Sequence, residues 1–195
     1  MIHQRKPKKY KDIYKTGKHL FWKYGMKRVS IEEICRESGV SKMTFYKYFP
    51  NKVELAKTIL TDLMEASILM VDQLIESDIP FSEKLEKLFL MKLEGSRDLS
   101  MEFIKDIYKN PESGLVHHME ELKQKSLAVI VKFYQTAQKQ GSIRKDLKIE
   151  FILALTNQIA VMIQDEKLVS LYDQPQDFIM ESMNVIFYGI VTDNA

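Results

Sequence analysis

Apolar residues recur at three- and four-residue intervals along most of the chain, which is the spacing of helices with one buried face. In residues 10–24, for example, Ile13, Leu20 and Phe21 fall on a single helical face. No stretch alternates apolar and polar residues as half-buried strands do, and only 7 Gly and 5 Pro interrupt the chain. The pattern therefore predicts an all-α fold.

Near the N-terminus, the pattern predicts three short helices and one long helix, marked by polar capping residues. Ser30, Ser41 and Asn51 each precede a helical pattern, where a side-chain oxygen accepts a hydrogen bond from a free backbone amide. A glutamate three residues after Ser30 and after Asn51 completes a capping box. Gly39 ends the second helix and Pro50 ends the third. The distance between the first two caps is typical of a helix-turn-helix.

Further helices are predicted beyond Pro80, separated by breaks that contain glycine, proline or neighbouring polar residues. We predict about nine helices in all. They divide into an N-terminal helix-turn-helix domain at 1–52 and a second helical domain at 53–195. The fourth helix belongs to both, so no flexible linker is expected. The later helices are expected at 82–93, 99–108, 114–140, 149–168 and 174–191.

The charge of the chain is divided unevenly along its length. The whole chain has a net charge of +2, but residues 1–52 hold 14 Lys and Arg against 4 Asp and Glu, a net of +10. The other 143 residues hold 15 basic and 23 acidic side chains, a net of −8. This asymmetry indicates an N-terminal segment that binds a polyanion. A solvated basic face is the alternative that charge alone leaves open.

The short third helix, between Ser41 and Pro50, has an unusual outer face. Phe45 and Phe49 are four residues apart and are expected to point inward. Hydroxyl and ammonium groups bond to phosphates, and residues near the start of such a helix reach base edges in the major groove. The composition of the outer face, without any acidic residue, therefore indicates a DNA-contacting helix. Its exposed residues are Lys42, Met43, Thr44, Tyr46, Lys47 and Tyr48.

This part of the chain closely resembles the tetracycline-repressor (TetR) family of bacterial transcription regulators. The family pattern has a helix that begins with Thr or Ser, an Ala-Gly-Val-Ser turn, a Thr-Leu-Tyr-x-His-Phe core and then Lys-x-x-Leu. The resemblance covers roughly the first third of the chain, and beyond it helix lengths and breaks agree with the family. The matching residues are Ser30, Ile34, Gly39, Val40, Ser41, Thr44, Tyr46, Phe49, Lys52 and Leu55.

The resemblance implies a homodimeric repressor that binds a palindromic operator in double-stranded DNA and is released by a small-molecule effector. It makes residues 1–52 the DNA-binding domain and residues 53–195 the effector-binding and dimerisation domain. Lys42, Met43 and Lys47 are then expected to face the bases, with Tyr48 at the edge of the groove. Most of the other residues of the site are expected to contact phosphates. The expected DNA-binding residues are Ser30, Ser41, Lys42, Met43, Thr44, Tyr46, Lys47, Tyr48 and Lys52.

The chain departs from the family pattern at four positions. Tyr48 replaces the usual His, which changes the geometry of any phosphate contact there. Phe45 replaces Leu and Cys35 replaces Ala, and both are conservative changes of packing. Gly17 replaces a helix-stabilising Ala, which costs the helix about 1 kcal/mol. The sequence does not show what compensates for this cost.

The last two predicted helices favour a homodimer. Ile152, Ile159 and Ile163 mark one face of residues 149–163, while other apolar residues lie on the remaining faces. Helices that are apolar nearly all round have to be covered on more than one side, and pairing with a second copy would cover them. The alternative is a monomer with buried core helices. The last helix has the same character, with Phe178, Ile179, Met183, Ile186, Phe187 and Ile190.

An effector pocket is expected on helices that enclose a cavity in relatives. Most of the candidate residues are aromatic or aliphatic, and Asn157 interrupts an otherwise apolar helix, where a buried amide needs a partner. Ordinary core packing is the alternative for each of them. For Asn157, a hydrogen bond between its side-chain amide and that of Gln158 across the dimer is a further alternative. The candidate effector residues are Phe89, Phe103, Ile107, Ile130, Tyr134 and Asn157.

Other chemistry is weakly supported by the sequence. His117 and Glu121 share a helical face as a metal-ligand pair would, but no third ligand is visible nearby, and no metal or cofactor is expected. Cys35 is the single cysteine, which excludes an internal disulfide and fits a reducing cytoplasm. No membrane span is expected, and neither is a catalytic constellation.

Two other classes of protein remain as alternatives. One is a helical enzyme whose basic N-terminus is incidental. The other is a protein-binding module that uses the basic segment to hold an acidic partner. In both cases DNA binding would be absent, so a measurement of DNA affinity separates them from the regulator.

Overall fold

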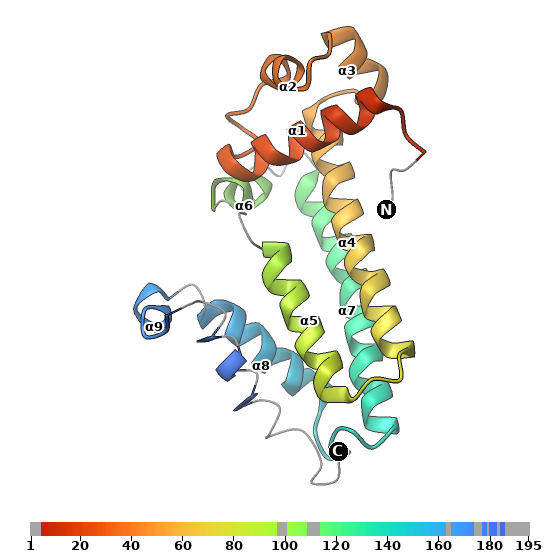
Figure 1. Cartoon of the computed structure of the whole chain (residues 1–195), viewed down its shortest axis with the longest axis vertical. Helices are drawn as coiled ribbons and strands as arrows, with labels where there is room; N and C mark the ends of the chain where they lie inside the picture. The colour runs from red at the N-terminus through yellow and green to blue at the C-terminus, as the bar shows by residue number, and fades with distance from the viewer. Residues whose placement is uncertain are drawn as a thin grey trace. The chain divides into compact units, whose positions relative to one another are not determined.

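The computed structural model describes residues 5–96, 101–108, 114–162, 165–173, 177–178, 180–182 and 184–185. Every regular element within these residues is an α-helix, which confirms the predicted all-α fold. The helices α1 to α9 follow one another in chain order, and two of the longest, α4 and α7, contribute to both of the compact units into which the chain divides (Figure 1).

The first unit consists of residues 1–69 and 95–126. It contains the three short N-terminal helices, the helix α6 and the beginnings of the two long helices. In Figure 1, α1 crosses the first part of α4, and α2 and α3 lie together at one end of the unit. The helices are α1 (Lys8–Tyr24), α2 (Ile31–Ser38), α3 (Lys42–Tyr48), α4 (Lys52–Glu76), α6 (Met101–Tyr108) and α7 (Leu115–Lys139).

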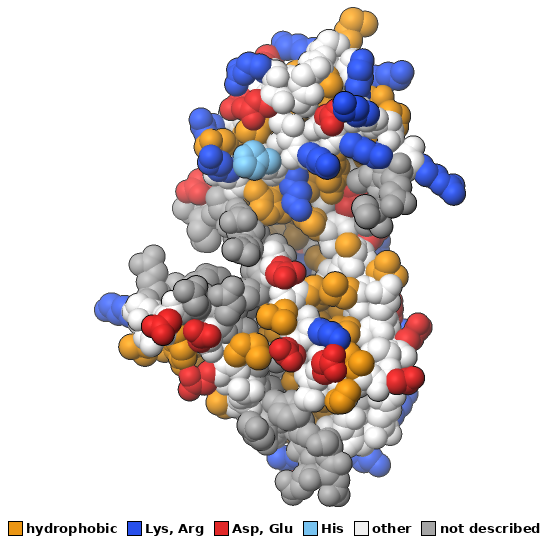
Figure 2. All heavy atoms as spheres, viewed as in Figure 1, with side chains coloured by type: hydrophobic (Ala, Val, Ile, Leu, Met, Phe, Trp, Pro, Cys, Tyr) orange, Lys and Arg blue, Asp and Glu red, His pale blue; other side chains and the backbone are white. Residues whose placement is uncertain are grey.

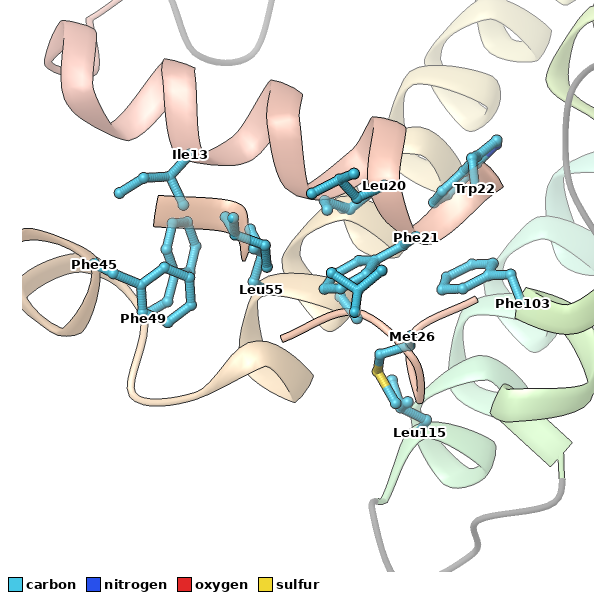
Figure 3. Packing of buried hydrophobic residues seen from close by; sticks show 14 of the residues in the cluster. Ile13, Leu20, Phe21, Trp22, Met26, Phe45, Phe49, Leu55, Phe103 and Leu115 are labelled. Atoms are coloured by element: carbon cyan, nitrogen blue, oxygen red, sulfur yellow. The ribbon is translucent and has the colours of Figure 1, made fainter. Parts of the chain in front are cut away.

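A single aromatic and aliphatic cluster fills the first unit. Figure 3 shows Leu55 of α4 beneath α1, between the phenylalanines that α3 contributes and Phe21. Phe103 of α6 stacks on Phe21 at a ring-centroid distance of 6.3 Å and lies 4.7 Å from the ring of Trp22. The helix α6 is therefore part of the same core as α1, although almost 80 residues separate them in sequence.

The second unit consists of residues 70–94 and 127–195. Its core takes Val71 from the end of α4, Leu88 from α5, Phe133 from α7 and Ile152 from α8. The predicted boundary at residue 52 separates two functional domains and not these two compact units, and it stays a prediction. The remaining helices are α5 (Phe81–Ser96), α8 (Ile149–Met162) and α9 (Glu166–Val169).

Several details of the helices differ from the sequence-based prediction or lie beyond the described residues. The helix predicted at 82–93 runs from Phe81 to Ser96. The first helix begins at Lys8, before the predicted start at residue 10. The predicted helix at 149–168 ends at Met162, because Asp165 accepts hydrogen bonds from the amides of Lys167 and Leu168 and so starts a new helix. Most of the predicted helix at 174–191 lies outside the described residues, although Phe178 is described and buried.

The structure explains the glycine in α1. A Cβ atom at Gly17 would lie 2.6 Å from Cδ2 of Leu55, which is closer than any ordinary contact. Leu55 is fully buried and surrounded by the core of the first unit. Gly17 therefore permits α1 and α4 to approach closely, and the packing of Leu55 offsets the lower helix propensity of glycine.

Candidate nucleic-acid interface

The two helices of the helix-turn-helix begin at the serines predicted to cap them. The side chain of Ser30 accepts a hydrogen bond from the amide of Glu33 at 3.1 Å. That of Ser41 accepts one from the amide of Thr44 at 3.2 Å, and the two hydroxyl oxygens of this pair lie 3.0 Å apart. Gly39 joins the helices with φ of +67°, a conformation that favours glycine. The turn is thus fixed by local bonds.

The short helix α3 has one buried face and one exposed face. Phe45 is completely buried and Phe49, the C-cap residue, is almost completely buried, as the spacing predicts. Met43 is 85% exposed and Tyr46 is 53% exposed, which are large values for residues of this type. Lys47 is exposed beside them. A methionine and a tyrosine kept in solvent on a rigidly held helix point to a surface that a partner covers.

One of the expected base-contacting residues has a partner within the protein. Lys42 forms an ion pair with Glu32 of α2, and both side chains are more than half exposed. The hydrogen bond from Lys42 lowers the pKa of the Glu32 carboxyl, and the same bond raises the pKa of Lys42. Both groups are consequently charged at neutral pH.

Tyr48, at the end of α3, packs against the first turn of α1. Its ring makes an edge-on contact with Tyr10 at a centroid distance of 5.7 Å. Tyr10 also lies 5.0 Å from Phe49 and is almost completely buried. These contacts fix the start of α1 beside the end of α3, an arrangement that the sequence analysis did not predict because the residues are far apart along the chain.

Lys52 is held by the loop between α1 and α2. Its ammonium group donates hydrogen bonds to the carbonyl oxygens of Met26 at 2.8 Å, Lys27 at 3.2 Å and Val29 at 2.8 Å. An ammonium group has three donors, and all three are occupied here. Burial lowers the pKa of Lys52, an effect opposed by the nearby carboxylate of Asp106. The expected phosphate contact of Lys52 stays a prediction, and the structure gives this side chain a second role.

The same loop is held from a second side by α6. The carboxylate of Asp106 accepts a hydrogen bond from the amide of Lys27 at 2.7 Å. Gly25, with φ of +79°, ends α1 at this point, and a Cβ atom there would lie 2.7 Å from Asp106 Oδ2. Sequence reasoning missed Asp106, since nothing in the pattern of α6 indicates that one of its acids reaches a loop 79 residues earlier.

The surface of the first unit is strongly basic. Figure 2 shows many lysine and arginine side chains over the region of α1 to α3. Arg5, Lys6, Lys8 and Lys9 are all exposed at the start of α1. The structure therefore presents the excess positive charge on the same unit that exposes Met43 and Tyr46.

The structure places the candidate effector residues in different surroundings. Phe89, Ile130 and Tyr134 are buried together in the core of the second unit. Phe103 and Ile107 are buried in the core of the first unit, with α1. Because these two side chains pack in the core with the N-terminal helices, they are core residues in this structure. Asn157 is exposed on α8.

Tyr134 has a buried hydroxyl group. The side chain is 1% exposed, and burial raises its pKa. Its ring meets Phe133 edge-on at 5.3 Å, but its hydroxyl forms no hydrogen bond with the residues that the structure describes. Buried hydroxyl groups normally have a partner, so this one is suited to a bound ligand or an ordered water molecule.

The structure also shows the surroundings of the candidate metal-binding pair and of the single cysteine. Nε2 of His117 lies 3.2 Å from Oε1 of Glu121 on the exposed face of α7. No group of three or more His, Cys, Asp or Glu able to hold a metal ion occurs among the described residues. Cys35 is buried, which raises the pKa of its thiol. Among the described helices, none is long and apolar enough to cross a membrane.

Comparison with known proteins agrees with this geometry. Residues 13–59 match the family model described as bacterial regulatory proteins, tetR family. A Bacillus subtilis (strain 168) protein described as the uncharacterized HTH-type transcriptional regulator YhgD is 26% identical over 159 residues, which cover 80% of this chain and 83% of that protein.

Solved structures share the fold over nearly the whole chain. The fatty acid degradation regulator FadR from Bacillus halodurans matches with a TM-score of 0.75 and 15% identity, covering 94% of this chain and 97% of its own. Salmonella enterica GusR matches with a TM-score of 0.73 and 18% identity, covering 94% of this chain and 96% of its own. Likeness at this level of identity shows the fold.

The capped pair of helices, the exposed face of α3 and the basic surface define a helix-turn-helix DNA-binding protein. The sequence match at residues 13–59 and the similarity to an HTH-type regulator support a transcription regulator whose N-terminal helices resemble those of the TetR family. The solved structures show that the fold is shared over nearly the whole chain. The comparisons point to a regulator and not to an enzyme.

Proposed function

We propose that the protein is a repressor that binds a palindromic operator as a homodimer and is released from DNA by a small-molecule effector. The observation that carries the proposal is the outer face of α3, where Met43 and Tyr46 are exposed while Phe45 holds the helix from within. A helix of this kind fits the major groove, because its exposed residues project as a group from a fixed base.

The residues of α3 divide into two roles in this proposal. Met43, Lys42 and Lys47 contact base edges, with Met43 suited to the methyl group of thymine and the lysines to guanine acceptors. The remaining residues lie where hydroxyl groups or helix N-termini meet the phosphates. The phosphate contacts are assigned to Ser30, Ser41, Thr44, Tyr46 and Tyr48, whereas Lys52 is assigned to holding the loop between α1 and α2.

The exposed face of α8 supports the dimer. Ile152 is completely buried in the core of the second unit, whereas Phe151 is 55% exposed, and Val161 and Met162 at the end of the helix are also exposed. Large apolar side chains that lie in solvent on a helix are typical of a surface that a partner covers. We assign this face to pairing with a second copy, together with the segment at 174–191, and a two-fold axis matches a palindromic operator.

The effector is proposed to bind in the second unit at Phe89, Ile130 and Tyr134. Phe103 and Ile107 are not included, because they pack in the core of the first unit. An effector that is largely apolar and carries one hydrogen-bond acceptor would suit these side chains, since the Tyr134 hydroxyl is the polar group among them.

The Tyr134→Phe variant tests the effector proposal. Removal of a buried hydroxyl that has no partner among the described residues is expected to leave the free energy of unfolding unchanged or to raise it by up to about 1 kcal/mol. Urea denaturation of the variant and the wild type measures this. A loss of about 1 kcal/mol or more would show that the hydroxyl already has a partner inside the protein, and the proposed ligand contact would then be wrong.

The DNA-binding proposal is tested with fragmented genomic DNA. Fragments that the purified protein retains are sequenced, and the best of them is titrated at several salt concentrations. We expect a palindromic sequence and a steep fall of affinity with salt. The Lys47→Ala variant is expected to lose about tenfold or more of its preference for this fragment over unrelated DNA. The Lys148→Ala variant, which loses the same charge on the second unit, should retain it.

A further inference from the structure

The start of α1 carries a cluster of positive charge that the helix-turn-helix does not use. Arg5, Lys6, Lys8 and Lys9 are all exposed, and Asp12 is the single acidic residue among residues 5–31. We call these four basic residues the basic arm.

Contacts of Tyr10 fix the basic arm next to the end of α3. Tyr10 follows Lys9 directly, and its ring packs on Tyr48 and Phe49 at centroid distances of 5.7 Å and 5.0 Å. The ammonium group of Lys6 lies 5.2 Å from the centroid of the Tyr10 ring. The positive charge of the arm is consequently held beside the last residues of α3.

The local electrostatics of α1 do not explain this charge. The first turn of α1 has no acidic residue, and its N-cap, Pro7, offers no side-chain hydrogen bond. Cations at the N-terminus of a helix are unfavourable, because the backbone amides there carry partial positive charge. A cluster of lysines at this position lowers stability in the free protein, whereas a nearby polyanion would make the same charges favourable.

We propose that the basic arm binds phosphates of the DNA duplex on the flank of the groove that α3 occupies. This inference rests on the proposed function, which puts α3 in the major groove. A helix with its side chains is about 10–12 Å across and the major groove is about 12 Å wide, so α3 would fill the groove, and a segment that packs on the end of α3 would lie near the groove wall. The wall is lined by phosphates.

The position of the arm favours DNA over an acidic protein as its partner. The arm and the exposed residues of α3, including Lys47, belong to the same compact unit and are joined by the contact of Tyr10 with Tyr48. A duplex bound to α3 therefore passes close to the arm, and no other partner is needed to neutralise its charge.

A triple variant tests the proposal against a matched control. The arm variant carries Lys6→Gln, Lys8→Gln and Lys9→Gln. The control carries Lys139→Gln, Lys145→Gln and Lys148→Gln, which removes the same charge from exposed lysines of the second unit. Affinity for the fragment retained from genomic DNA is measured at several salt concentrations for the wild type and both variants, after circular dichroism has shown that their helix contents agree.

Each lysine that contacts a phosphate contributes about 0.9 to the slope of log affinity against log salt concentration. The arm variant is expected to show a slope smaller by up to about 2.7 per bound protomer, with affinity reduced alike for the best fragment and for unrelated DNA. The control should keep the wild-type slope.

An unchanged slope in the arm variant, or an equal reduction in the control, would overturn the inference while leaving the contacts of α3 intact. If the wild type itself retains no DNA, the proposed function fails and the arm inference fails with it.

Discussion

Gly17 illustrates how a single residue is determined by packing that the sequence pattern does not reveal. The capping roles of Ser30 and Ser41 were predictable, because each acts within three residues of its own position. The reason for Gly17 was not, since it depends on Leu55, which approaches from another helix.

The Gly17→Ala variant is expected to be less stable than the wild type, although alanine is the better helix former. The added methyl group has to displace Leu55 from a filled core, which costs about 1–3 kcal/mol, against about 1 kcal/mol gained in helix propensity. Urea denaturation measures the net change in the free energy of unfolding.

A double-mutant cycle with Leu55→Val checks the cause of this loss. Valine is shorter and leaves room near Gly17, so Gly17→Ala should be less harmful in that background than in the wild type. If the two substitutions are simply additive, the contact between Gly17 and Leu55 is not what makes glycine necessary.

At the scale of elements, α4 and α6 hold the loop between α1 and α2. Lys52 occupies three carbonyl oxygens of this loop, and Asp106 accepts the amide of Lys27. The family resemblance predicted a phosphate contact for Lys52. A resemblance transfers the role of a motif residue from relatives, and it gives no information about the hydrogen bonds that Lys52 makes within this protein. The geometry supports a positioning role, in which Lys52 sets the orientation of α2 and α3.

The Lys52→Met variant separates these two roles. Loss of the ammonium group leaves loop carbonyls without a donor, so the free energy of unfolding is expected to fall by about 1–2 kcal/mol. Lys57→Met is the control on the same helix, because Lys57 pairs with Glu54 and not with the loop, and it should change stability by less than about 1 kcal/mol. Unchanged stability of Lys52→Met, with a salt slope smaller by about 0.9, would instead assign Lys52 to phosphate.

At the scale of the whole molecule, helix periodicity and caps were sufficient to predict the all-α fold and the position of the helix-turn-helix. The residues of α3 that face inward or outward also followed from spacing, since Phe45 and Phe49 are buried and Met43 and Tyr46 are exposed. Spacing did not predict which of the two cores contains a residue of a later helix. Phe103 packs with α1, because long-range contacts depend on how helices are arranged in space.

The uneven charge of the chain is also a property of the whole molecule. The basic segment at 1–52 carries the helix-turn-helix and the arm, while the rest of the chain is acidic. Such a division directs one end of the protein to DNA and keeps the rest from binding it nonspecifically. In the proposed function, phosphate contacts of this segment set the affinity for DNA, and a few residues of α3 set the sequence preference.

Hydroxyl-radical footprinting on the retained genomic fragment tests the central claim most directly. A dimer that places one α3 in each of two successive major grooves protects two tracts related by two-fold symmetry. Their centres should lie about 34–36 Å apart, or a multiple of this distance. The Met43→Ala, Lys47→Ala double variant should weaken both tracts together. A single protected tract, or no protection by the wild type at low salt, would contradict the account.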